Sequence, residues 1–235
     1  MNKTVGILGG MGPMATVDLF RKIIESTPAK TDQDHLKIII YNNPQIPSRN
    51  QEITGGKEDP LFELIRSARL LESSGADFIL IPCHAAHYWI ESLRKTVDIP
   101  ICSMIDITVD YVEKYHEEDS ILLLANTNTL KRKLFEIPFR SRGLHLLYPK
   151  PDEQGMIVSA INDVKAGFIS KNKFIQSLND LIKHYCSLGV TSVIGGCTEI
   201  PLLFPFLEQR VKMIDPTELL ASRAVALARD ESPNN

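Results

Sequence analysis

Short aliphatic runs alternate with longer stretches of helical periodicity along almost the whole 235-residue chain. The runs lack the polar alternation of a half-exposed strand, so they predict strands that are buried on both faces. Strands are expected at Val5–Leu8, Lys37–Tyr41, Phe78–Ile81, Ile99–Ile101, Ile121–Leu124, Leu144–Tyr148 and Ser192–Ile194. This alternation predicts an α/β fold of parallel sheets with helices on both faces.

The stretches between the strands predict the helices. In the stretch from Pro60 to Ser74 the apolar residues fall on one stripe, Pro60 suits a first turn, and Gly75 suits a C-terminal cap. The helices are expected at Thr16–Ser26, Pro60–Ser74, Trp89–Val97, Thr108–His116, Thr129–Phe135, Gly155–Gly167, Lys173–Leu188 and Thr217–Arg229. The segment between Tyr41 and Gly56 has no periodicity and is predicted to be an ordered loop.

The chain also contains an internal repeat. Cys83 follows the helix-ending Gly75 across one strand, and Cys197 follows Gly189 in the same way, 114 residues later. The first strands of the two halves are 116 residues apart. We therefore expect two αβα domains related by an approximate two-fold. The first is expected at 1–106 plus 211–235, with a returning C-terminal helix, and the second at 107–210.

Composition and patterning exclude several classes of protein. A net charge of −3 gives no reason to expect nucleic acid or an anionic membrane as a partner. Four cysteines without a C-x-x-C pair predict neither a disulfide framework nor a structural zinc site. Glycines interrupt the first residues, and no apolar run approaches the ~18 residues of a membrane-spanning helix. A cytoplasmic protein with reduced thiols is expected.

Two of the four cysteines occupy positions suited to catalysis. Cys83 and Cys197 each follow a strand of a parallel sheet, where ligands collect, and each precedes the start of a helix, whose N–H groups favour a thiolate. If the two halves face each other, one thiolate can take a proton from a carbon atom while the other thiol delivers a proton to its opposite face. Cys102 and Cys186 have no such counterpart and are predicted to be packing residues.

A glycine-rich turn follows the first strand. Gly10-x-Gly12-x-x-Ala15 fits a dinucleotide fingerprint, but the next strand ends in Tyr41-Asn42-Asn43 without the required carboxylate. We therefore expect no nucleotide cofactor. The exposed amides of Gly10, Met11 and Gly12 can instead bind a carboxylate, unless these glycines only turn the chain.

Other polar residues near the cysteines have two interpretations. Arg49, in the aperiodic loop, can bind a carboxylate bidentately, whereas Lys165 lies near a helix end where lysines are usually solvated. His84, His87 and Glu199 flank the cysteines, where they either tune the thiols or cap helices. The motif Cys83-His84-x-x-His87 lacks a third ligand, so no metal is expected.

Several segments of the chain resemble the aspartate/glutamate racemase family of PLP-independent amino-acid racemases. They are Val5–Pro13, Asn42–Arg49, Pro82-Cys83, Ala86-His87 and Gly195-Gly196-Cys197-Thr198-Glu199-Ile200-Pro201-Leu202. The resemblance implies a cofactor-free, usually homodimeric enzyme with its active site between two α/β domains. It also implies that Cys83 and Cys197 are catalytic, and that Arg49 and Lys165 form the basic pair that selects aspartate.

One segment departs from this family. Where the family commonly reads Pro-Cys-Asn-Thr-Ala-His, this chain reads Pro82-Cys83-His84-Ala85-Ala86-His87. His84 and Ala85 thus stand where the family usually binds the α-carboxylate, together with the amides of Gly10–Gly12 and of the residues after each cysteine, such as Thr198. We expect interconversion of L- and D-aspartate. The alternatives are a racemase of another amino acid (glutamate or broad specificity) and a dicarboxylate-binding protein without turnover.

Overall fold

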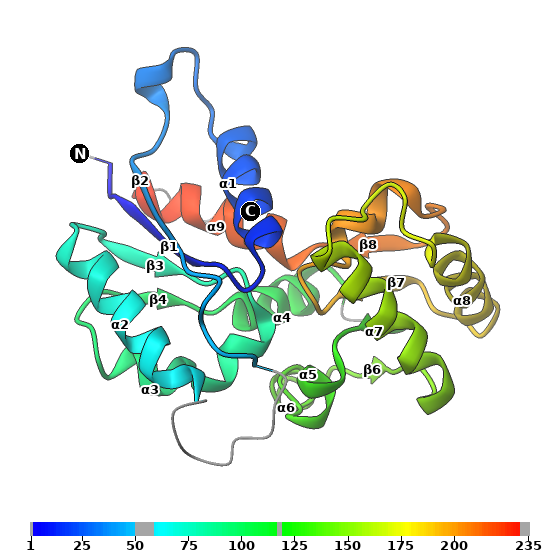
Figure 1. Ribbon diagram of the computed structural model, residues 1–235. Helices are drawn as coiled ribbons and strands as arrows, with labels where there is room; N and C mark the ends of the chain where they lie inside the picture. The colour runs from blue at the N-terminus through cyan, green and yellow to red at the C-terminus, as the bar shows by residue number, and fades with distance from the viewer. Residues whose placement is uncertain (1, 50–58, 117–118, 231–235) are drawn as a thin grey trace. The chain divides into compact units, whose positions relative to one another are not determined.

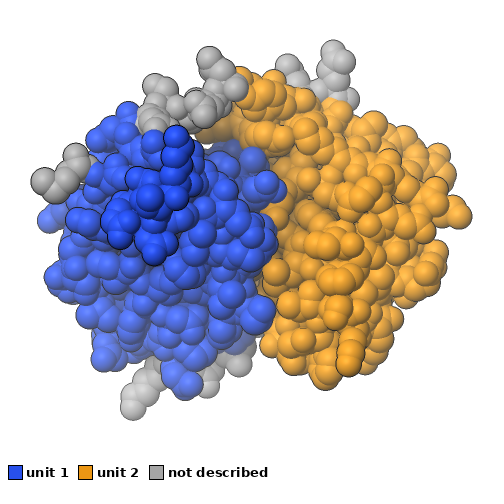
Figure 2. All heavy atoms as spheres, turned by 90° about the horizontal axis from the view of Figure 1, so that it is seen from above, with its two compact units in different colours: residues 1–107, 217–235 blue, residues 108–216 orange. Residues whose placement is uncertain are grey.

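The computed structural model describes residues 2–49, 59–116 and 119–230 of the chain (Figure 1). The chain splits into two compact units, residues 1–107 with 217–235 and residues 108–216, which are coloured separately in Figure 2. Residues 50–56 of the predicted loop lie outside the described part of the chain. Within that part, no helix is both long enough and apolar enough to cross a membrane.

The first unit is built on a parallel four-stranded sheet of order β2-β1-β3-β4. Its strands are β1 (Val5–Gly9), β2 (Ile38–Asn42), β3 (Phe78–Leu80) and β4 (Ile101–Cys102). Its helices are α1 (Pro13–Ser26), η1 (Asp32–Asp34), α2 (Pro60–Ser73), η2 (His84–Trp89), α3 (Ile90–Arg94) and α9 (Pro216–Ala228), where η marks a 3-10 helix. Figure 1 shows α2 and α3 on one face of this sheet and α1 and α9 on the other.

The second unit repeats this plan with a parallel sheet of order β6-β5-β7-β8. Its strands are β5 (Ile121–Leu124), β6 (Leu146–Leu147), β7 (Ser192–Gly195) and β8 (Lys212–Ile214). Its helices are α5 (Thr127–Lys131), α6 (Glu136–Ser141), α7 (Pro151–Lys165), α8 (Ile175–Ser187) and η3 (Pro201–Phe206). Helix α4 (Met104–Tyr115) begins in the first unit and ends in the second.

The two sheets confirm the predicted fold class and the internal repeat. Both have the same strand order, and the strands pair in the same register: Val5 lies beside Phe78, and Ile121 lies beside Ser192. The central strands β1, β3, β5 and β7 are buried along their whole lengths, as predicted. The prediction of two-sided burial is wrong for β2 and β6, because they are edge strands and stay partly exposed.

Each sheet packs its apolar residues against the helices that cover it. Leu64, Ala68 and Leu71, from the predicted stripe of α2, are fully buried in a cluster with Ile79 of β3. In the second unit, residues of α7 and α8 bury Leu122 of β5 in the same way. At roughly 1.5–3 kcal/mol for each large side chain, this burial is the main term that holds the helices to the sheets.

Several predicted boundaries are wrong, mostly at helix starts. Prolines at the first position of α1 and α7 begin these helices before the expected Thr16 and Gly155. The expected helix Trp89–Val97 is η2 followed by the short α3, and Thr129–Phe135 is replaced by α5 and α6. β8 was not anticipated. It pairs with β7 and belongs to the second unit, so residues 211–216 differ from the expected domain assignment.

Candidate active site

The two cysteines singled out by the repeat lie at equivalent places in the two sheets. Phe78 and Ser192 pair with the first residues of the central strands, and Cys83 and Cys197 each follow five residues later. Both therefore lie just beyond the carboxyl ends of β3 and β7. Cys83 is buried at 5% exposure, whereas Cys197 is partly exposed. This edge is where parallel sheets place their ligand sites.

The glycine-rich turn in the first unit brings the ends of β1 and β2 together. Gly10 has φ +97°, and a Cβ atom there would lie 2.3–2.6 Å from the backbone atoms of Asn43. The amide of Asn43 donates a hydrogen bond to the carbonyl of Gly9 at 3.2 Å. Only glycine fits such a close approach at a positive φ. Close packing against Asn43 therefore requires a glycine at position 10, whether or not the turn binds a ligand.

Thr16, which the sequence predicts only as the start of a helix, holds this turn closed. The Thr16 hydroxyl accepts a hydrogen bond from the Gly10 amide at 2.9 Å and donates one to the Gly12 carbonyl at 3.4 Å. A Cβ atom on Gly9 would lie 2.4 Å from the Thr16 hydroxyl oxygen. The Gly10 amide is therefore occupied. Of the three predicted anion-binding positions, Met11 is buried and Gly12 caps α1.

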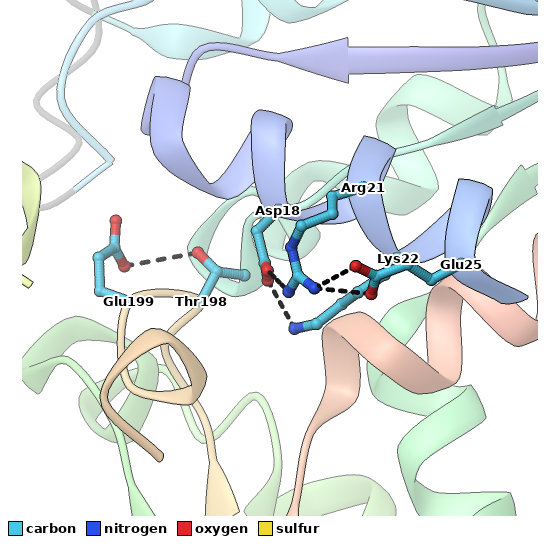
Figure 3. Close-up of polar contacts among 6 residues, drawn as sticks. All are labelled: Asp18, Arg21, Lys22, Glu25, Thr198 and Glu199. Atoms are coloured by element: carbon cyan, nitrogen blue, oxygen red, sulfur yellow. Dashed lines mark hydrogen bonds and ion pairs between the residues drawn. The ribbon is translucent and has the colours of Figure 1, made fainter. Parts of the chain in front are cut away.

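A buried ion pair on α1 was also missed. The Asp18 carboxylate, 3% exposed, accepts hydrogen bonds from Lys22 at 2.6 Å and from Arg21 at 2.8 Å (Figure 3). A buried carboxylate is tolerable only when it is paired in this way. In the sequence, Arg21 and Lys22 follow Asp18 at the i+3 and i+4 positions of a predicted helix, and this spacing indicates such an ion pair.

His87 joins the Cys83 loop to the start of α4. Its Nδ1 lies 2.9 Å from the carbonyl oxygen of Cys83, and its Nε2 accepts a hydrogen bond from the amide of Met104 at 3.0 Å. A carbonyl only accepts, so Nδ1 carries the proton, and the ring is neutral. Burial lowers the pKa of His87 to about 4, which agrees with that state. Both ring nitrogens are used on the backbone, so His87 positions Cys83.

His84, one of the predicted substrate contacts, is also buried. It is 2% exposed, and burial, followed by the neighbouring His87, holds its pKa well below the usual range. A neutral imidazole cannot contribute a positive charge to bind a carboxylate, although it can donate one N–H. Ala85, next to it, is partly exposed and has no polar side-chain atom.

We expect His87 to make the protein less stable in acid. Its folded pKa of about 4 lies below the value of 6.5 for an unperturbed histidine, so the unfolded chain binds more protons between these values. The free energy of unfolding should therefore fall as the pH falls from about 6.5 to 4, in total by about 3 kcal/mol from this residue. Urea unfolding at a series of pH values measures the loss.

Two histidine variants test whether His87 causes this loss of stability in acid. His87→Gln should be less stable at neutral pH but should show a flatter acid dependence than the wild type. His145→Gln, which changes an exposed side chain, should keep the wild-type dependence. Equal acid dependence in the wild type and His87→Gln would contradict the assignment of a buried neutral His87.

In the second unit, two glycines set the path of the chain into Cys197. A Cβ atom on Gly195 would lie 2.7 Å from the ring of Pro201, and one on Gly196 would lie 2.5 Å from Leu123. The chain then turns, and the Ile200 amide donates to the Cys197 carbonyl at 2.9 Å. These approaches fix where Cys197 lies relative to the end of β5.

Glu199 is the polar residue that contacts the Cys197 thiol. The Cys197 sulfur lies 2.9 Å from the Oε2 atom of Glu199. The Thr198 hydroxyl donates to the same oxygen at 3.4 Å (Figure 3). Thr198 and Glu199 are each only 2% exposed. Three predicted site residues are thus brought together around one carboxylate oxygen.

The two predicted carboxylate-binding cations have different surroundings. The Nη1 atom of Arg49 donates to the carbonyls of Ile46 and Pro47 at 3.0 and 2.9 Å. Its Nε atom is buried and has no hydrogen-bond partner among the residues that the structure describes. The guanidinium is therefore held by its own loop. Lys165 is exposed in the last turn of α7, where a solvated lysine is common.

The other two cysteines differ from this pair. Burial raises the pKa of Cys102 to about 11, so its thiol stays protonated. Cys186 is partly exposed on α8 and packs against the core of the second unit. Within residues 2–49, 59–116 and 119–230, no group of three or more His, Cys, Asp or Glu side chains could hold a metal ion.

Comparison with protein families identifies the relatives of this arrangement. The model of the Asp/Glu/hydantoin racemase family matches residues 8–224, a range that includes both cysteine loops and the glycine-rich turn. The chain belongs to the Asp/Glu/hydantoin racemase family. This confirms the resemblance seen in the sequence motifs.

Individual members of the family are similar to this chain over nearly its full length. The aspartate racemase of Picrophilus torridus is 28% identical, with a TM-score of 0.83 over 97% of this chain and 94% of that one. An aspartate racemase homologue from Pyrococcus horikoshii is 27% identical, with a TM-score of 0.77 over 97% of this chain and 100% of that one. A broad-specificity amino-acid racemase from Bacillus subtilis is 23% identical over 94% of this chain and 96% of that protein.

More distant members of the family share the fold. Glutamate racemase from Francisella tularensis has a TM-score of 0.75 at 13% identity, over 100% of this chain and 85% of that one. The relatives of this chain therefore include racemases that are named for different amino acids. Membership in the racemase family supports an amino-acid racemase and leaves the substrate to be decided by the site.

Proposed function

We propose that this racemase-family protein interconverts L- and D-aspartate by proton transfer between two cysteines, without a cofactor. The observation that carries the proposal is the equivalent placement of Cys83 and Cys197 beyond the strands of two sheets in the same register. A racemase must remove the α-proton from one face of Cα and return a proton to the other. Two equivalent acid/base groups on one substrate supply that chemistry.

In the proposed reaction, a thiolate of one cysteine takes the α-proton, and the electron pair stays on Cα. The thiol of the other cysteine then gives its proton to the opposite face, which leaves it as the new thiolate. The α-proton is weakly acidic, so N–H donors at the α-carboxylate must stabilise the carbanion-like transition state. We assign this role to the main-chain amides of Met11 and Gly12 and of the residues after each cysteine, with His84 as a further N–H donor.

We assign binding of the side-chain carboxylate to Arg49 and Lys165. The anchoring of Arg49 by two main-chain carbonyls supports this assignment, because a preorganised guanidinium loses little freedom when it binds an anion. The similarity to the Picrophilus aspartate racemase also favours aspartate over glutamate. A homodimer and a cytoplasmic location stay predictions.

Deuterium incorporation from D₂O tests the activity and its substrate together. We expect L-aspartate, incubated with the enzyme without PLP, to gain deuterium at Cα and to lose optical purity, whereas L-alanine, which lacks a side-chain carboxylate, should react far more slowly. Arg49→Gln should raise the KM for aspartate by about 10- to 100-fold, since hydrogen bonds between charged groups contribute roughly 1.5–3 kcal/mol. Chiral chromatography and mass spectrometry follow both changes.

The matched control is Arg66→Gln, which removes an exposed guanidinium from α2 and should leave the KM unchanged. If no amino acid exchanges its α-hydrogen, the racemase proposal is wrong. If ligand-dependent shifts in melting temperature occur without exchange, the protein binds dicarboxylates without turnover. If another amino acid exchanges and aspartate does not, only the substrate was assigned wrongly.

A further inference from the structure

The loops that follow the two cysteines differ in sequence, and one of the differences places a carboxylate beside a thiol. With the offset of 114 residues, His84 corresponds to Thr198 and Ala85 corresponds to Glu199. The loop after Cys197 therefore carries a carboxylate that the loop after Cys83 lacks. The strands before these loops pair in the same register, so the difference lies in the side chains.

The carboxylate of Glu199 is aimed at the thiol. The Cys197 sulfur lies 2.9 Å from the Oε2 atom of Glu199, which is 2% exposed and so has little water to solvate its charge. By contrast, no carboxylate is hydrogen-bonded to the Cys83 sulfur among the residues that the structure describes. The main-chain carbonyl of Cys83, and not its thiol, is the atom that His87 binds.

The position of the proton follows from the chemistry of the pair. A carboxylate is a weaker base than a thiolate, so a proton shared by a carboxylate and a thiol resides on sulfur, and the Cys197 thiol donates to Glu199. Ionising the thiol would place a second negative charge in contact with the carboxylate at low solvent exposure, which is unfavourable. Glu199 therefore opposes formation of a thiolate at Cys197, whereas no carboxylate of the described residues is hydrogen-bonded to the Cys83 sulfur.

We propose that Glu199 holds Cys197 as the protonated thiol in the free enzyme, so that Cys83 is the resting base and Cys197 the resting acid. This inference rests on the proposed two-cysteine racemisation. In the free enzyme, the enantiomer that presents its α-proton to Cys83 reacts directly. Cys83 accepts that proton, Cys197 donates its own to the opposite face, and Glu199 remains ionised beside the new thiolate of Cys197.

The opposite enantiomer requires the other protonation state, with a thiolate at Cys197 and a thiol at Cys83. The equilibrium constant of racemisation is unity, so kcat/KM must be equal for the two enantiomers. The asymmetry must therefore appear in kcat and KM separately. Glu199 is a positioning residue in this scheme, because it acts on the protonation of Cys197 and not on the substrate.

Alkylation of the thiols as a function of pH tests the proposal directly. Iodoacetamide reacts with thiolates, and peptide mass spectrometry separates Cys83 from Cys197. Because the two thiols differ in burial, their absolute alkylation rates are not compared. The pH of half-maximal alkylation is determined for each thiol instead. In Glu199→Gln, which keeps the shape and removes the charge, we expect the alkylation profile of Cys197 to move to lower pH by about one unit or more. The profile of Cys83 should stay in place.

Glu91→Gln is the matched control, since it removes an exposed carboxylate from α3 and should move neither profile. In the wild type, half-maximal alkylation of Cys197 should occur at a higher pH than that of Cys83, which tests the proposal even if Glu199→Gln folds poorly. An unmoved Cys197 profile in folded Glu199→Gln, or a wild-type order that is reversed, would overturn it. Deuterium exchange into aspartate tests the racemisation separately, so failure of one proposal is distinguishable from failure of the other.

Discussion

Replacement of Cys83 or of Cys197 by alanine should reduce the racemisation of aspartate by at least about 10³-fold. A positioned acid/base group contributes roughly 10²–10⁴-fold, and each variant lacks one of the two groups that the reaction needs. The losses should not add in the double variant, because the two thiols act as a unit. Optical rotation of L- and D-aspartate measures the rates in both directions.

The single variants should also differ in a way that a damaged fold would not produce. Cys197→Ala keeps Cys83 as a base, so it should exchange the α-hydrogen of one enantiomer with D₂O without inverting it. Cys83→Ala should do the same slowly for the other enantiomer. Retention of configuration during exchange, in opposite enantiomers for the two variants, is specific to a two-thiol mechanism.

The remaining two cysteines provide the controls. Cys102→Ala and Cys186→Ala should keep activity within about twofold of the wild type, because the proposed reaction does not use these thiols. Burial keeps the Cys102 thiol protonated, and Cys186 packs against the hydrophobic core of the second unit. A large loss in either control, or near wild-type racemisation in Cys83→Ala, would contradict the assignment. Glu199→Gln should lie between the two groups, since it changes the protonation of a reacting thiol without removing it.

Features set by local sequence were predictable here. Buried strands read from aliphatic runs placed Cys83 and Cys197 correctly at the carboxyl ends of β3 and β7, because a strand that is buried on both faces has no other pattern. The repeat then gave the equivalence of the two loops, which the common register confirms. The edge strands β2 and β6 have similar composition but are partly exposed, and their position in the sheet is not a local property.

Contacts between distant segments were not predictable. The sequence admits two roles for His87. Its partner Met104 lies 17 residues away across β4, so no local pattern indicates this hydrogen bond. The three-residue strand β8 contains too few residues to show a period, and only its pairing with β7 defines it. By contrast, the prolines at the starts of α1 and α7 were local signals that place these helix boundaries.

The glycine-rich turn shows how a motif and a packing constraint coincide. Its sequence admits a nucleotide, a carboxylate or a simple turn, and sequence alone does not choose among them. The structure adds that Gly10 lies against the backbone of Asn43 and that its amide is bound by Thr16. The turn therefore has a structural requirement for glycine that is independent of any ligand, and this requirement has a measurable consequence.

Gly10→Ala should destabilise the protein by about 2–5 kcal/mol. The positive φ costs an L-residue about 1–2 kcal/mol, and the forced displacement of packed atoms typically costs about 1–3 kcal/mol more. The displaced atoms at Gly10 are the main-chain N, C and O of Asn43, at 2.3–2.6 Å from the new Cβ, so no flexible side chain can move aside. The end of β2 must shift instead. Urea unfolding followed by circular dichroism measures the change.

Gly75→Ala is the control that separates the cost of the positive φ from the cost of displacing packed atoms. Gly75 has φ +93°, nearly the same as Gly10, but a Cβ atom there has no neighbour within 4 Å. It ends α2, so an alanine there should cost only the conformational term, about 1–2 kcal/mol. Equal losses in the two variants would mean that the chain relaxes around Gly10 at no cost. A larger loss at Gly10 would assign the difference to the close approach between the β1–α1 turn and the end of β2, and hence to the geometry that places Arg49 and its loop beyond that strand.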